Sequence, residues 1–487
     1  PEPLGLAAIG DPETTHRFAD IARQEYRAVG IVQALSPMAD LATEPRWPRV
    51  LGTFGEDATL AKSQTRAYVT GFQSGEQGLS SKSVASVVKH WAGYGAAKDG
   101  YDSHSYYGRF ATFPGNNFEE HLTPFVGAFE ANVSGVMPTF SILQDLIHNG
   151  VEQEQVGGGF NEYLLKDLLR ESYGFEGVIL SDWSITKDCN DVCKLGIADG
   201  KIQDRENIST AWGVIDRSPE ERYALALTAG IDQFGGIDSP MYLLKAVSSG
   251  LVSEDRLDLS VRRLLIQKFK LGIFEKPFVD ETLAQDIVGK NSFQEQAKIA
   301  QAKALVLLEN KENLLPLGDK PLKVFLYEID ADAAREAGFD PVSTPEAADL
   351  AIMRLTTPFE QNHKNYMFGR RHHEGNLAYL PGNPDYDAVK SASQQVPVIA
   401  TVFLERPAIL TSIQNDVSAL IGNFGVSDQV LFRVLKGDAE PQGNLPIELP
   451  SSMEAVVNQS EDLPYDSESP LYAFGYGLRY GGLSNEK

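Results

Sequence analysis

The sequence predicts an α/β protein in which a (β/α)-barrel-like N-terminal domain precedes an α/β sandwich domain. In the first half, short runs rich in valine and isoleucine alternate with amphipathic stretches, which is the rhythm of consecutive βα units. Near residue 276 this rhythm stops, and continuous apolar runs begin after residue 300. We therefore expect a barrel-like catalytic domain over 1–275, a linker over 276–300, and a sandwich domain with a C-terminal tail over 301–487.

The expected strands of the first domain each end near a polar residue. Consecutive βα units form a parallel sheet, so these residues should gather on the face where barrel enzymes carry their active sites. A closed barrel needs eight strands, and the remaining ones are expected to be irregular or to precede Pro1. The recognisable runs and their terminal residues are GIVQAL with Ser36, SVASVV with Lys89 and His90, NVSGVM with Thr139, GVILS with Asp182, and AGI with Asp232.

The second domain is expected to be layered. Its apolar runs are continuous, which is typical of strands that are buried on both faces of a sheet. A turn-rich tail, from LPSSMEAVVNQ to FGYGLRY, is expected to wrap back over the structure. The predicted strands are ALVLLEN, KVFLYEI, LAIMRL, VPVIATVFL and VSALIGNFG.

Composition argues against several classes of partner. The chain of 487 residues is 42% hydrophobic, so it is not a disordered chain. Its 43 Lys and Arg against 67 Asp and Glu give a net charge of −24, which repels phosphate backbones and anionic lipid. No run approaches the roughly 18 apolar residues of a membrane span. We expect a neutral or cationic partner, no nucleic acid and no membrane span, and a homodimer stays open.

The N-terminus and the two cysteines bear on the compartment. The chain opens with PEPLGLAAIGD, without a methionine or a leader, so we expect any targeting signal to be missing from the sequence as given. Cys189 and Cys193 are four residues apart, and either a disulfide or two reduced thiols on one helical turn fits that spacing. We expect a periplasmic or secreted protein rather than a cytoplasmic one.

Three polar clusters are predicted to share the upper face of the barrel. GFEGVILSDWS puts Asp182 at the end of a buried strand, with Trp183 beside it. The carboxylate could cap a helix or join a structural ion pair, or it could be a nucleophile or base under a ring that stacks on the tryptophan. VVKHWAGYG adds Lys89 and His90, and EPRWPR adds Arg49. Their convergence favours a site that binds sugar hydroxyls.

Five motifs, in order along the chain, resemble those of glycoside hydrolase family 3. EPRWPR…GEDA (44–58) resembles the family's DPRWGR…GEDP, KHWAGYG (89–95) its KHFxGYG, and GFEGVILSDW (174–183) its GFxGxxxSDW. GDAEPQGNLP (437–446) resembles GDxxPxGxLP, and FGYGLRY (474–480) resembles FGYGLSY. The resemblance implies a barrel-like domain, a sandwich domain and a site between them. It also implies retaining, exo-acting removal of β-linked sugars from non-reducing ends.

The resemblance also implies roles for individual residues. Asp182 matches the family's nucleophile, and Trp183 matches its aromatic wall. The family usually has tyrosine where this chain has Phe140, so no orienting phenol is expected there. A sugar-binding aspartate precedes the PLGLAA segment in the family, so the chain resembles a member that lacks its N-terminal segment. The substrate-binding positions that match are Arg49, Lys89, His90, Met137 and Phe140.

Retaining hydrolysis needs a second group, about 5–5.5 Å from the nucleophile, that protonates the leaving oxygen. Two-domain family members use a glutamate after a strand ending in RxSGE, and here LAIMRLTTPFEQNH has Pro358 in that register. Glu360, two residues on, is therefore the first candidate. The family's N-acetylglucosaminidase branch uses a His–Asp dyad in a DSH triplet, which Asp102 and His104 resemble. Glu374, further along the same loop, is the third candidate.

The segment FGRRHHEG, residues 368–375, invites a metal or phosphate interpretation. Adjacent residues of one loop rarely converge on an ion, so we expect a solvated loop at the mouth of the site or a subunit contact, with neither metal nor cofactor. The expected activity is that of a β-glucosidase, with β-xylosidase activity as an option, on a small oligosaccharide or an aryl or alkyl β-glycoside. The alternatives are an N-acetyl-β-glucosaminidase that uses His104 and Asp102, and a non-catalytic carbohydrate-binding member.

Overall fold

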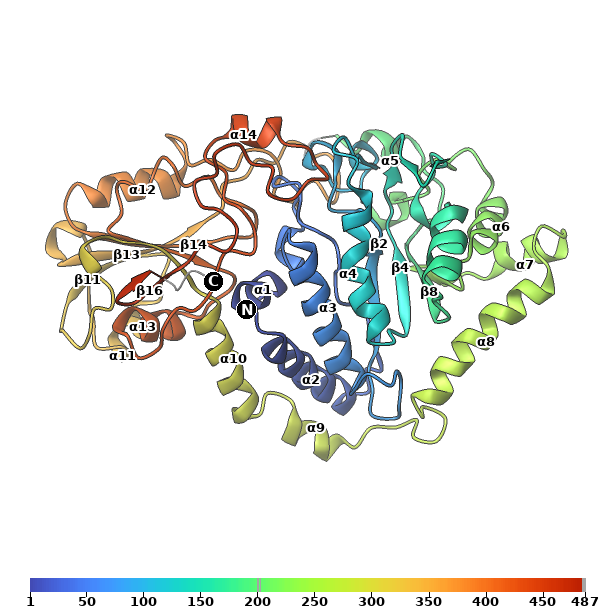
Figure 1. Cartoon of the computed structure of the whole chain (residues 1–487), viewed down its shortest axis with the longest axis horizontal. Coiled ribbons are helices and arrows are strands. Elements are labelled where there is room, and N and C mark those ends of the chain that lie inside the picture. Colours follow the sequence, from blue (N-terminus) through green and yellow to red (C-terminus); the bar gives the residue numbers. More distant parts are fainter. Residues whose placement is uncertain (199–200, 202, 484–487) are drawn as a thin grey trace.

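The computed structural model, which describes residues 1–198, 201 and 203–483, contains two α/β domains (Figure 1). The N-terminal domain has a five-stranded parallel sheet of order β1-β2-β4-β8-β9. Two short strand pairs lie outside this sheet, β3 with β5 and β6 with β7. The strands are β1 (Gln33–Ala34), β2 (Ala85–Trp91), β3 (Phe110–Ala111), β4 (Gly135–Pro138), β5 (Ile142–Leu143), β6 (Ile147–His148), β7 (Val151–Glu152), β8 (Val178–Trp183) and β9 (Gln233–Gly235).

Helices cover the outer face of this sheet. Their starts are encoded locally: Asp11 caps α2, and Ser218 with Glu221 forms a capping box at α6. The helices are α1 (Pro3–Ile9), α2 (Pro12–Ala28), α3 (Ala58–Gln73), α4 (Phe118–Glu130), the π-helical segment Tyr163–Ser172, α5 (Asp191–Leu195), α6 (Pro219–Ala229), α7 (Met241–Ser248) and α8 (Glu254–Lys270).

The strands of this sheet are those that the sequence predicts, with one correction. Asp232 was expected at the C-terminal end of its strand, but it lies just before β9. The AGI run begins at Ala229, the last residue of α6, and continues into the turn before β9, so it is not a strand. Asp232 is buried at this opposite edge, where it pairs with Arg170 at 2.7 Å and Arg263 at 2.9 Å. It therefore belongs to the base of the sheet and not to the site.

The second domain is built on an eight-stranded sheet of order β12-β11-β13-β14-β15-β10-β16-β17. All five predicted runs are strands in it, and the short strands β12, β16 and β17 are additions. Alternate residues of β13 face opposite layers, so that Met353 packs toward α12 and Ile352 toward α13. The strands are β10 (Val306–Asn310), β11 (Lys323–Tyr327), β12 (Asp340–Val342), β13 (Leu350–Thr356), β14 (Val398–Phe403), β15 (Ala419–Asn423), β16 (Leu478–Arg479) and β17 (Gly482–Leu483).

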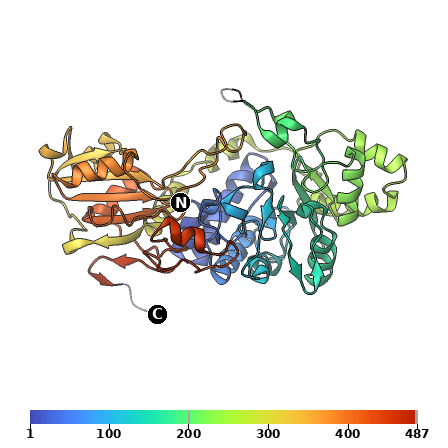
Figure 2. The ribbon, with the colours of Figure 1, turned by 90° about the horizontal axis from the view of Figure 1, so that it is seen from above.

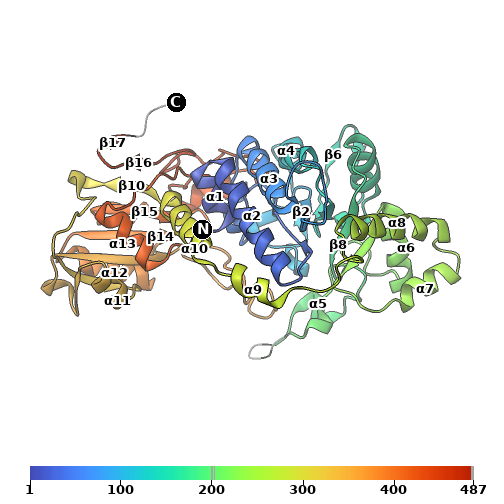
Figure 3. The ribbon, with the colours of Figure 1, turned by 90° about the horizontal axis from the view of Figure 1, so that it is seen from below.

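Two helices, α9 (Glu281–Ile287) and α10 (Asn291–Ala304), connect the domains (Figure 3). The domain boundaries at 275 and 300 stay a prediction. Figure 2 shows the second domain at one end of the molecule and α7 and α8 at the other. No helix in the described part of the chain combines the length and the apolar character needed to cross a bilayer. The second domain's helices are α11 (Ala331–Glu336), α12 (Pro384–Ser393), α13 (Asp428–Lys436) and α14 (Met453–Asn458).

The C-terminal tail does wrap back over the first domain. Both oxygens of the buried Glu56 carboxylate accept backbone N–H groups from the tail, those of Glu448 and Tyr465. Asp462 is fully buried and accepts the N–H groups of Gly115 and Asn117 at 2.8 Å. These contacts fix the second domain against the loops at the upper face of the first.

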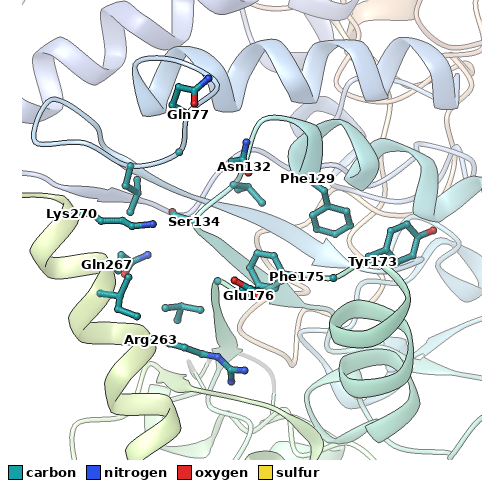
Figure 4. A pocket seen from close by; sticks show the side chains of 17 residues that line it. Gln77, Phe129, Asn132, Ser134, Tyr173, Phe175, Glu176, Arg263, Gln267 and Lys270 are labelled. Atoms are coloured by element: carbon teal, nitrogen blue, oxygen red, sulfur yellow. The ribbon is translucent and has the colours of Figure 1, made fainter.

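A hollow of about 460 Å³ opens at the lower edge of the first domain (Figure 4). It lies between α8 and the starts of β4 and β8, and its rim includes Asn132, Arg263 and Lys270. Because β8 runs from Val178 at this hollow to Asp182 at its other end, the hollow lies on the side away from the predicted site. In barrel folds, residues at this lower face serve stability and not catalysis.

Candidate active site

Asp182 is the penultimate residue of β8 and is buried, with only 8% of its surface exposed. Its Oδ1 accepts the backbone N–H of Trp183 at 2.8 Å. Its Oδ2 has no hydrogen-bond partner among the described residues and lies 3.7 Å from Nε2 of His90. Burial raises the pKa of Asp182, and the charges of His104, Arg49 and Lys89 oppose that rise. One oxygen is thus held by a hydrogen bond, and the other has no hydrogen-bond partner among the described residues.

His90, near the end of β2, is held by a buried carboxylate. Its Nδ1 lies 2.8 Å from Oδ2 of Asp40, and its backbone N–H is 3.2 Å from both oxygens of that carboxylate. The contact fixes the ring so that Nε2 faces Asp182 and the guanidinium of Arg49. Burial holds the pKa of His90 well below its ordinary value and raises that of Asp40 to about 7. His90 is therefore a neutral, oriented imidazole.

Two cations stand beside this pair. Nη1 of Arg49 lies 3.4 Å from Nε2 of His90, and the guanidinium carbon sits 5.2 Å from the ring centre of Tyr94. Lys89 precedes His90 in β2, and burial lowers the pKa of Lys89 to about 8. Both act electrostatically on Asp182. Their positive charges favour the ionised form of the Asp182 carboxylate.

Trp183 presents a solvent-accessible aromatic face next to Asp182. It is 43% exposed, which is unusual for a residue at the end of a central strand. The chain packs closely behind its ring, where a Cβ added at Gly236 would lie 2.3 Å from Cδ1 of Trp183. Gly236 also has a φ of +66°. Gly236, directly after β9, thus lets the indole pack against the backbone on one side while its other side is exposed.

His104 and Asp102 form a second polar cluster at the same face. His104 Nδ1 and Asp102 Oδ1 share a short hydrogen bond. The other carboxylate oxygen of Asp102 accepts from the Tyr94 hydroxyl at 2.9 Å and from Nε1 of Trp47 at 3.2 Å. Burial opposes the charge on Asp102, yet the neighbouring His104, His372 and Arg49 hold its pKa well below the ordinary value. This carboxylate is ionised and aligns the His104 ring.

Aromatic side chains enclose the His104 ring. Phe140, which follows β4, meets it edge to face with ring centres 5.0 Å apart, and Phe368 lies 4.4 Å away on the loop from the second domain. Met137 is buried between Val87 and Leu180 in the interior of the sheet. Phe140 therefore shapes the wall beside the dyad, and Met137 lies in the packed layer below it. Their substrate-binding roles stay predictions.

The loop after β13 reaches across from the second domain and carries both glutamate candidates. Glu360 is exposed, and its Oε2 accepts hydrogen bonds from Asn362 at 3.1 Å and from the backbone of Asn376 at 3.4 Å. Among the residues that the structure describes, the side-chain hydrogen bonds of Glu360 are confined to its own loop.

Glu374 lies on the same loop and is fully buried. It accepts the Tyr107 hydroxyl at 2.5 Å and lies 2.8 Å from Nδ1 of His363. The His363 ring stacks on Tyr107 with ring centres 3.7 Å apart. Glu374 thus fastens the loop to the first domain, and both of its oxygens are already engaged.

The loop is fastened to the first domain at a second point as well. The Tyr366 hydroxyl donates to the carbonyl of Lys194 at 2.6 Å, next to the Cys189–Cys193 disulfide, whose Cα atoms are 5.2 Å apart. Of the two cysteine states that the spacing allows, the bridged one is found. The site is therefore assembled from both domains.

Family models fit both parts of the chain. The glycosyl hydrolase family 3 N-terminal domain matches residues 1–266, and the C-terminal domain of the same family matches residues 339–480. The chain belongs to glycosyl hydrolase family 3. It is accordingly a glycoside hydrolase that acts on O-glycosyl bonds, as its sequence motifs predict.

Curated relatives and solved structures agree with this membership. A periplasmic beta-glucosidase/beta-xylosidase of Dickeya chrysanthemi is 56% identical over 98% of this chain and 72% of that protein. Beta-glucosidase C of Emericella nidulans is 40% identical over 99% of the chain and 75% of that protein. A beta-glucosidase structure from Listeria innocua superposes with a TM-score of 0.79 at 24% identity, over 99% of this chain and 70% of that one. The barrel-like domain followed by a sandwich domain is thereby confirmed.

Several residues of this family 3 site are not predicted from the sequence. Asp40 and Tyr94 support His90 and Asp102 from within the packed layer, and neither stands in a position that the pattern of strand ends singles out. Tyr94 does fall inside KHWAGYG, so its motif was a usable signal. His372 lies in the loop that is expected at the mouth of the site, but its approach to 4.0 Å from Asp102 is not predicted by the sequence. That contact depends on how the two domains pack, which local pattern does not encode.

Proposed function

We propose that this family 3 protein is a retaining, exo-acting β-glycosidase that releases a terminal non-reducing β-D-glucosyl residue, with β-xylosyl groups as a second substrate class. The carrying observation is the buried Asp182 carboxylate, whose Oδ2 is unpartnered among the described residues and faces His90. The names of the two relatives above, a beta-glucosidase/beta-xylosidase and a beta-glucosidase, support this substrate class. A small oligosaccharide or an aryl or alkyl β-glycoside would be the substrate.

In the first step, Oδ2 of Asp182 attacks the anomeric carbon, and the bond from that carbon to the leaving oxygen breaks. This forms a covalent glycosyl–Asp182 intermediate, and water then attacks the same carbon to release the sugar with retained configuration. The N–H of Trp183 keeps Oδ1 in place throughout, so that only Oδ2 reacts. The nearby Arg49 and Lys89 favour the ionised form of the carboxylate before attack.

Binding of the sugar falls to the groups around this carboxylate. Lys89 and Arg49 can donate charge-assisted hydrogen bonds to hydroxyl groups. His90 is oriented by Asp40 and offers its Nε2 toward the same space. The open face of Trp183 can stack on the apolar face of a pyranose ring. Such a site suits an uncharged ligand, in line with the strongly acidic composition.

We assign the proton donor to His104, held by Asp102, in preference to Glu360 and Glu374. Among the described residues, the Nε2 of His104 makes no hydrogen bond, and its charge acts on the pKa of Asp182. Glu360 is exposed and bonded within its own loop, and Glu374 has both oxygens engaged. An imidazole can donate a proton to the leaving oxygen and then accept one from water. The sequence motifs instead place Glu360 first among the three candidates for the proton donor.

The periplasm or the extracellular space is the proposed compartment. Two observations support it: the Cys189–Cys193 disulfide and the printed name of the Dickeya relative, which calls that protein periplasmic. Disulfides persist in oxidising compartments and are rare in the cytosol. To test this, the protein is isolated from periplasmic or culture-medium fractions with a reagent that traps free thiols. Its electrophoretic mobility should then change when the disulfide is reduced. Free thiols in the isolated protein would contradict it.

Replacement of the nucleophile tests the proposed function. Asp182→Ala should lower turnover of an aryl β-glucoside by at least about 10⁴-fold, as loss of a reacting group does in other enzymes. Because the side chain is small and lies at the site, circular dichroism and melting temperature should change little. Added azide should restore part of the rate and give a glycosyl azide of inverted configuration.

The matched control is Asp216→Ala, which removes an exposed aspartate from the same domain. That variant should keep the rate of the unmodified protein. If Asp182→Ala turned over the β-glucoside at a comparable rate, Asp182 would not be the nucleophile. Binding of glucose without turnover by the unmodified chain would instead favour a carbohydrate-binding member.

A further inference from the structure

Three potential metal ligands from the two domains converge beside the proposed nucleophile. The Asp102 carboxylate and one ring nitrogen each of His104 and His372 lie within 4.8 Å of one another. Asp102 and His104 come from a turn of the first domain, and His372 comes from the loop after β13. Convergence from separate segments is what a metal centre requires and what adjacent loop residues rarely achieve.

The Asp102 carboxylate is prepared to present one oxygen to this cluster. Tyr94 and Trp47 both donate to Oδ2 and hold the group in a single orientation. Oδ1 is left facing His104, with which it shares a hydrogen bond, and lies 4.0 Å from Nδ1 of His372. Fixed outer partners of this kind orient metal-binding carboxylates in known centres.

His372 is the member of the cluster whose position is otherwise unexplained. Its Nδ1 is buried and has no hydrogen-bond partner among the described residues. The ring packs against Phe368 and faces His104, with ring centres 5.7 Å and 5.9 Å apart. A buried ring nitrogen without a partner normally costs free energy, so an unfilled interaction remains at the point where the three side chains meet.

The distances fit a small divalent transition-metal ion after a modest adjustment. Zinc binds histidine nitrogen at about 2.0–2.1 Å and carboxylate oxygen at about 2.0–2.2 Å, so ligand atoms of a tetrahedral site lie roughly 3.4 Å apart. Here the three ligand atoms all lie within 4.8 Å of one another. Movement of the His372 ring by about 1–1.5 Å, together with rotation of His104, would bring all three into the zinc coordination range.

We propose that Asp102, His104 and His372 form a binding site for a divalent transition-metal ion such as Zn²⁺, and that its occupation inhibits the glycosidase. The two histidines and the carboxylate supply three ligands, and water completes the coordination. Binding releases the proton that Asp102 and His104 share to the solvent. The metal then occupies His104, so that residue can no longer donate to the leaving oxygen. The site stands on the geometry alone, whereas the inhibition rests on the proposed function.

Titration of the full chain with zinc chloride, followed by calorimetry without substrate, tests the site. The unmodified chain should bind one Zn²⁺, and His372→Ala should lower the affinity by at least about tenfold. His373→Ala is the matched control, because its ring lies one position further on, stacks on Phe359 and pairs with Glu405 outside the cluster. Equal zinc affinity in the two variants would overturn the site, as would the absence of one-to-one binding.

The effect on turnover is measured separately with an aryl β-glycoside and increasing zinc. The zinc concentration that halves the rate of turnover should rise at least about tenfold in His372→Ala and stay unchanged in His373→Ala. A chelator should restore the rate. Zinc that binds at the predicted residues without slowing turnover would contradict the assignment of His104 and leave the metal site intact. The two proposals can therefore fail independently.

Discussion

At the scale of single residues, the two oxygens of Asp182 differ in their hydrogen bonding. One is held by the Trp183 N–H and the other is left without a protein partner among the described residues. His90 lies 3.7 Å from the free oxygen and is itself held by Asp40. A buried carboxylate oxygen without a hydrogen-bond partner lowers the free energy of unfolding. Functional sites often contain buried groups of this kind.

The assignment of the proton donor is testable with leaving groups of different quality. His104→Ala should slow hydrolysis of an alkyl β-glucoside by about 10²–10⁴-fold, because a poor leaving group needs protonation. The dinitrophenolate of a dinitrophenyl β-glucoside leaves without being protonated. Formation of the glycosyl enzyme from this substrate should therefore be nearly unaffected by His104→Ala. The comparison uses kcat/KM on the two substrates, because kcat/KM reports the first step and not the later attack of water.

The control for this experiment is Glu360→Gln, which keeps the size of the side chain. It should slow both substrates by a similar small factor. If the dependence on the leaving group appeared in Glu360→Gln and not in His104→Ala, the second-domain glutamate would be the donor and the dyad would be structural.

At the scale of elements, the ends of β2 and β8 position the site. Lys89 and His90 close β2, and Asp182 and Trp183 close β8, so a parallel sheet brings all four to one face. These strands were predictable because their apolar runs are short, buried and followed by polar residues. The Asp40–His90 and Tyr94–Asp102 contacts were not, since each joins residues whose spacing follows no period of a strand or helix.

The packing behind Trp183 gives a prediction for the β9 turn. Gly236→Ala should tilt the indole, because the new Cβ would lie 2.3 Å from its ring, and kcat/KM for an aryl β-glucoside should fall at least about tenfold. The matched control is Gly250→Ala, which has a similar φ of +78° and no heavy atom within 4 Å. Both variants should lose about 1 kcal/mol of stability from left-handed strain. Equal kcat/KM in the two would show that the Trp183 ring is not held by this contact.

At the scale of the whole molecule, the second domain and the tail complete the site. The loop from β13 delivers Phe368 and His372 to the first domain, and Glu374 anchors it there. The sequence predicted the five main strands of this domain and the return of the tail, because buried strands and turn-rich segments have local signatures. It predicted the loop of His372 at the mouth of the site but not the approach of His372 to Asp102, because domain packing has no such signature.

The buried Glu56 makes the docking of the tail sensitive to pH. Burial raises the pKa of Glu56 to about 8, above its ordinary value of 4.5, so the folded protein binds a proton more tightly than the unfolded chain. The free energy of unfolding should therefore fall as the pH rises from about 4.5 to 8. Glu56→Gln removes this titration and should flatten that slope, by up to about 5 kcal/mol across the window, since each unit of pKa shift is worth about 1.4 kcal/mol. Urea unfolding at several pH values measures it.

The control for this titration is Glu76→Gln, an exposed residue paired with Arg66. Its slope should match that of the unmodified protein. An unchanged slope in Glu56→Gln would mean that Glu56 ionises in the folded protein as it does in the unfolded chain.

The central claim is that Asp182 bonds covalently to the anomeric carbon, and trapping of that bond tests it most directly. A 2-deoxy-2-fluoro-β-glucoside with a dinitrophenyl leaving group slows hydrolysis of the intermediate more than its formation, so the glycosyl enzyme should accumulate. Peptide mass spectrometry is expected to find one fluoroglucosyl group per chain, on the peptide that contains GVILSDW and at Asp182. A label on any other carboxylate, or inactivation without a covalent adduct, would contradict the account.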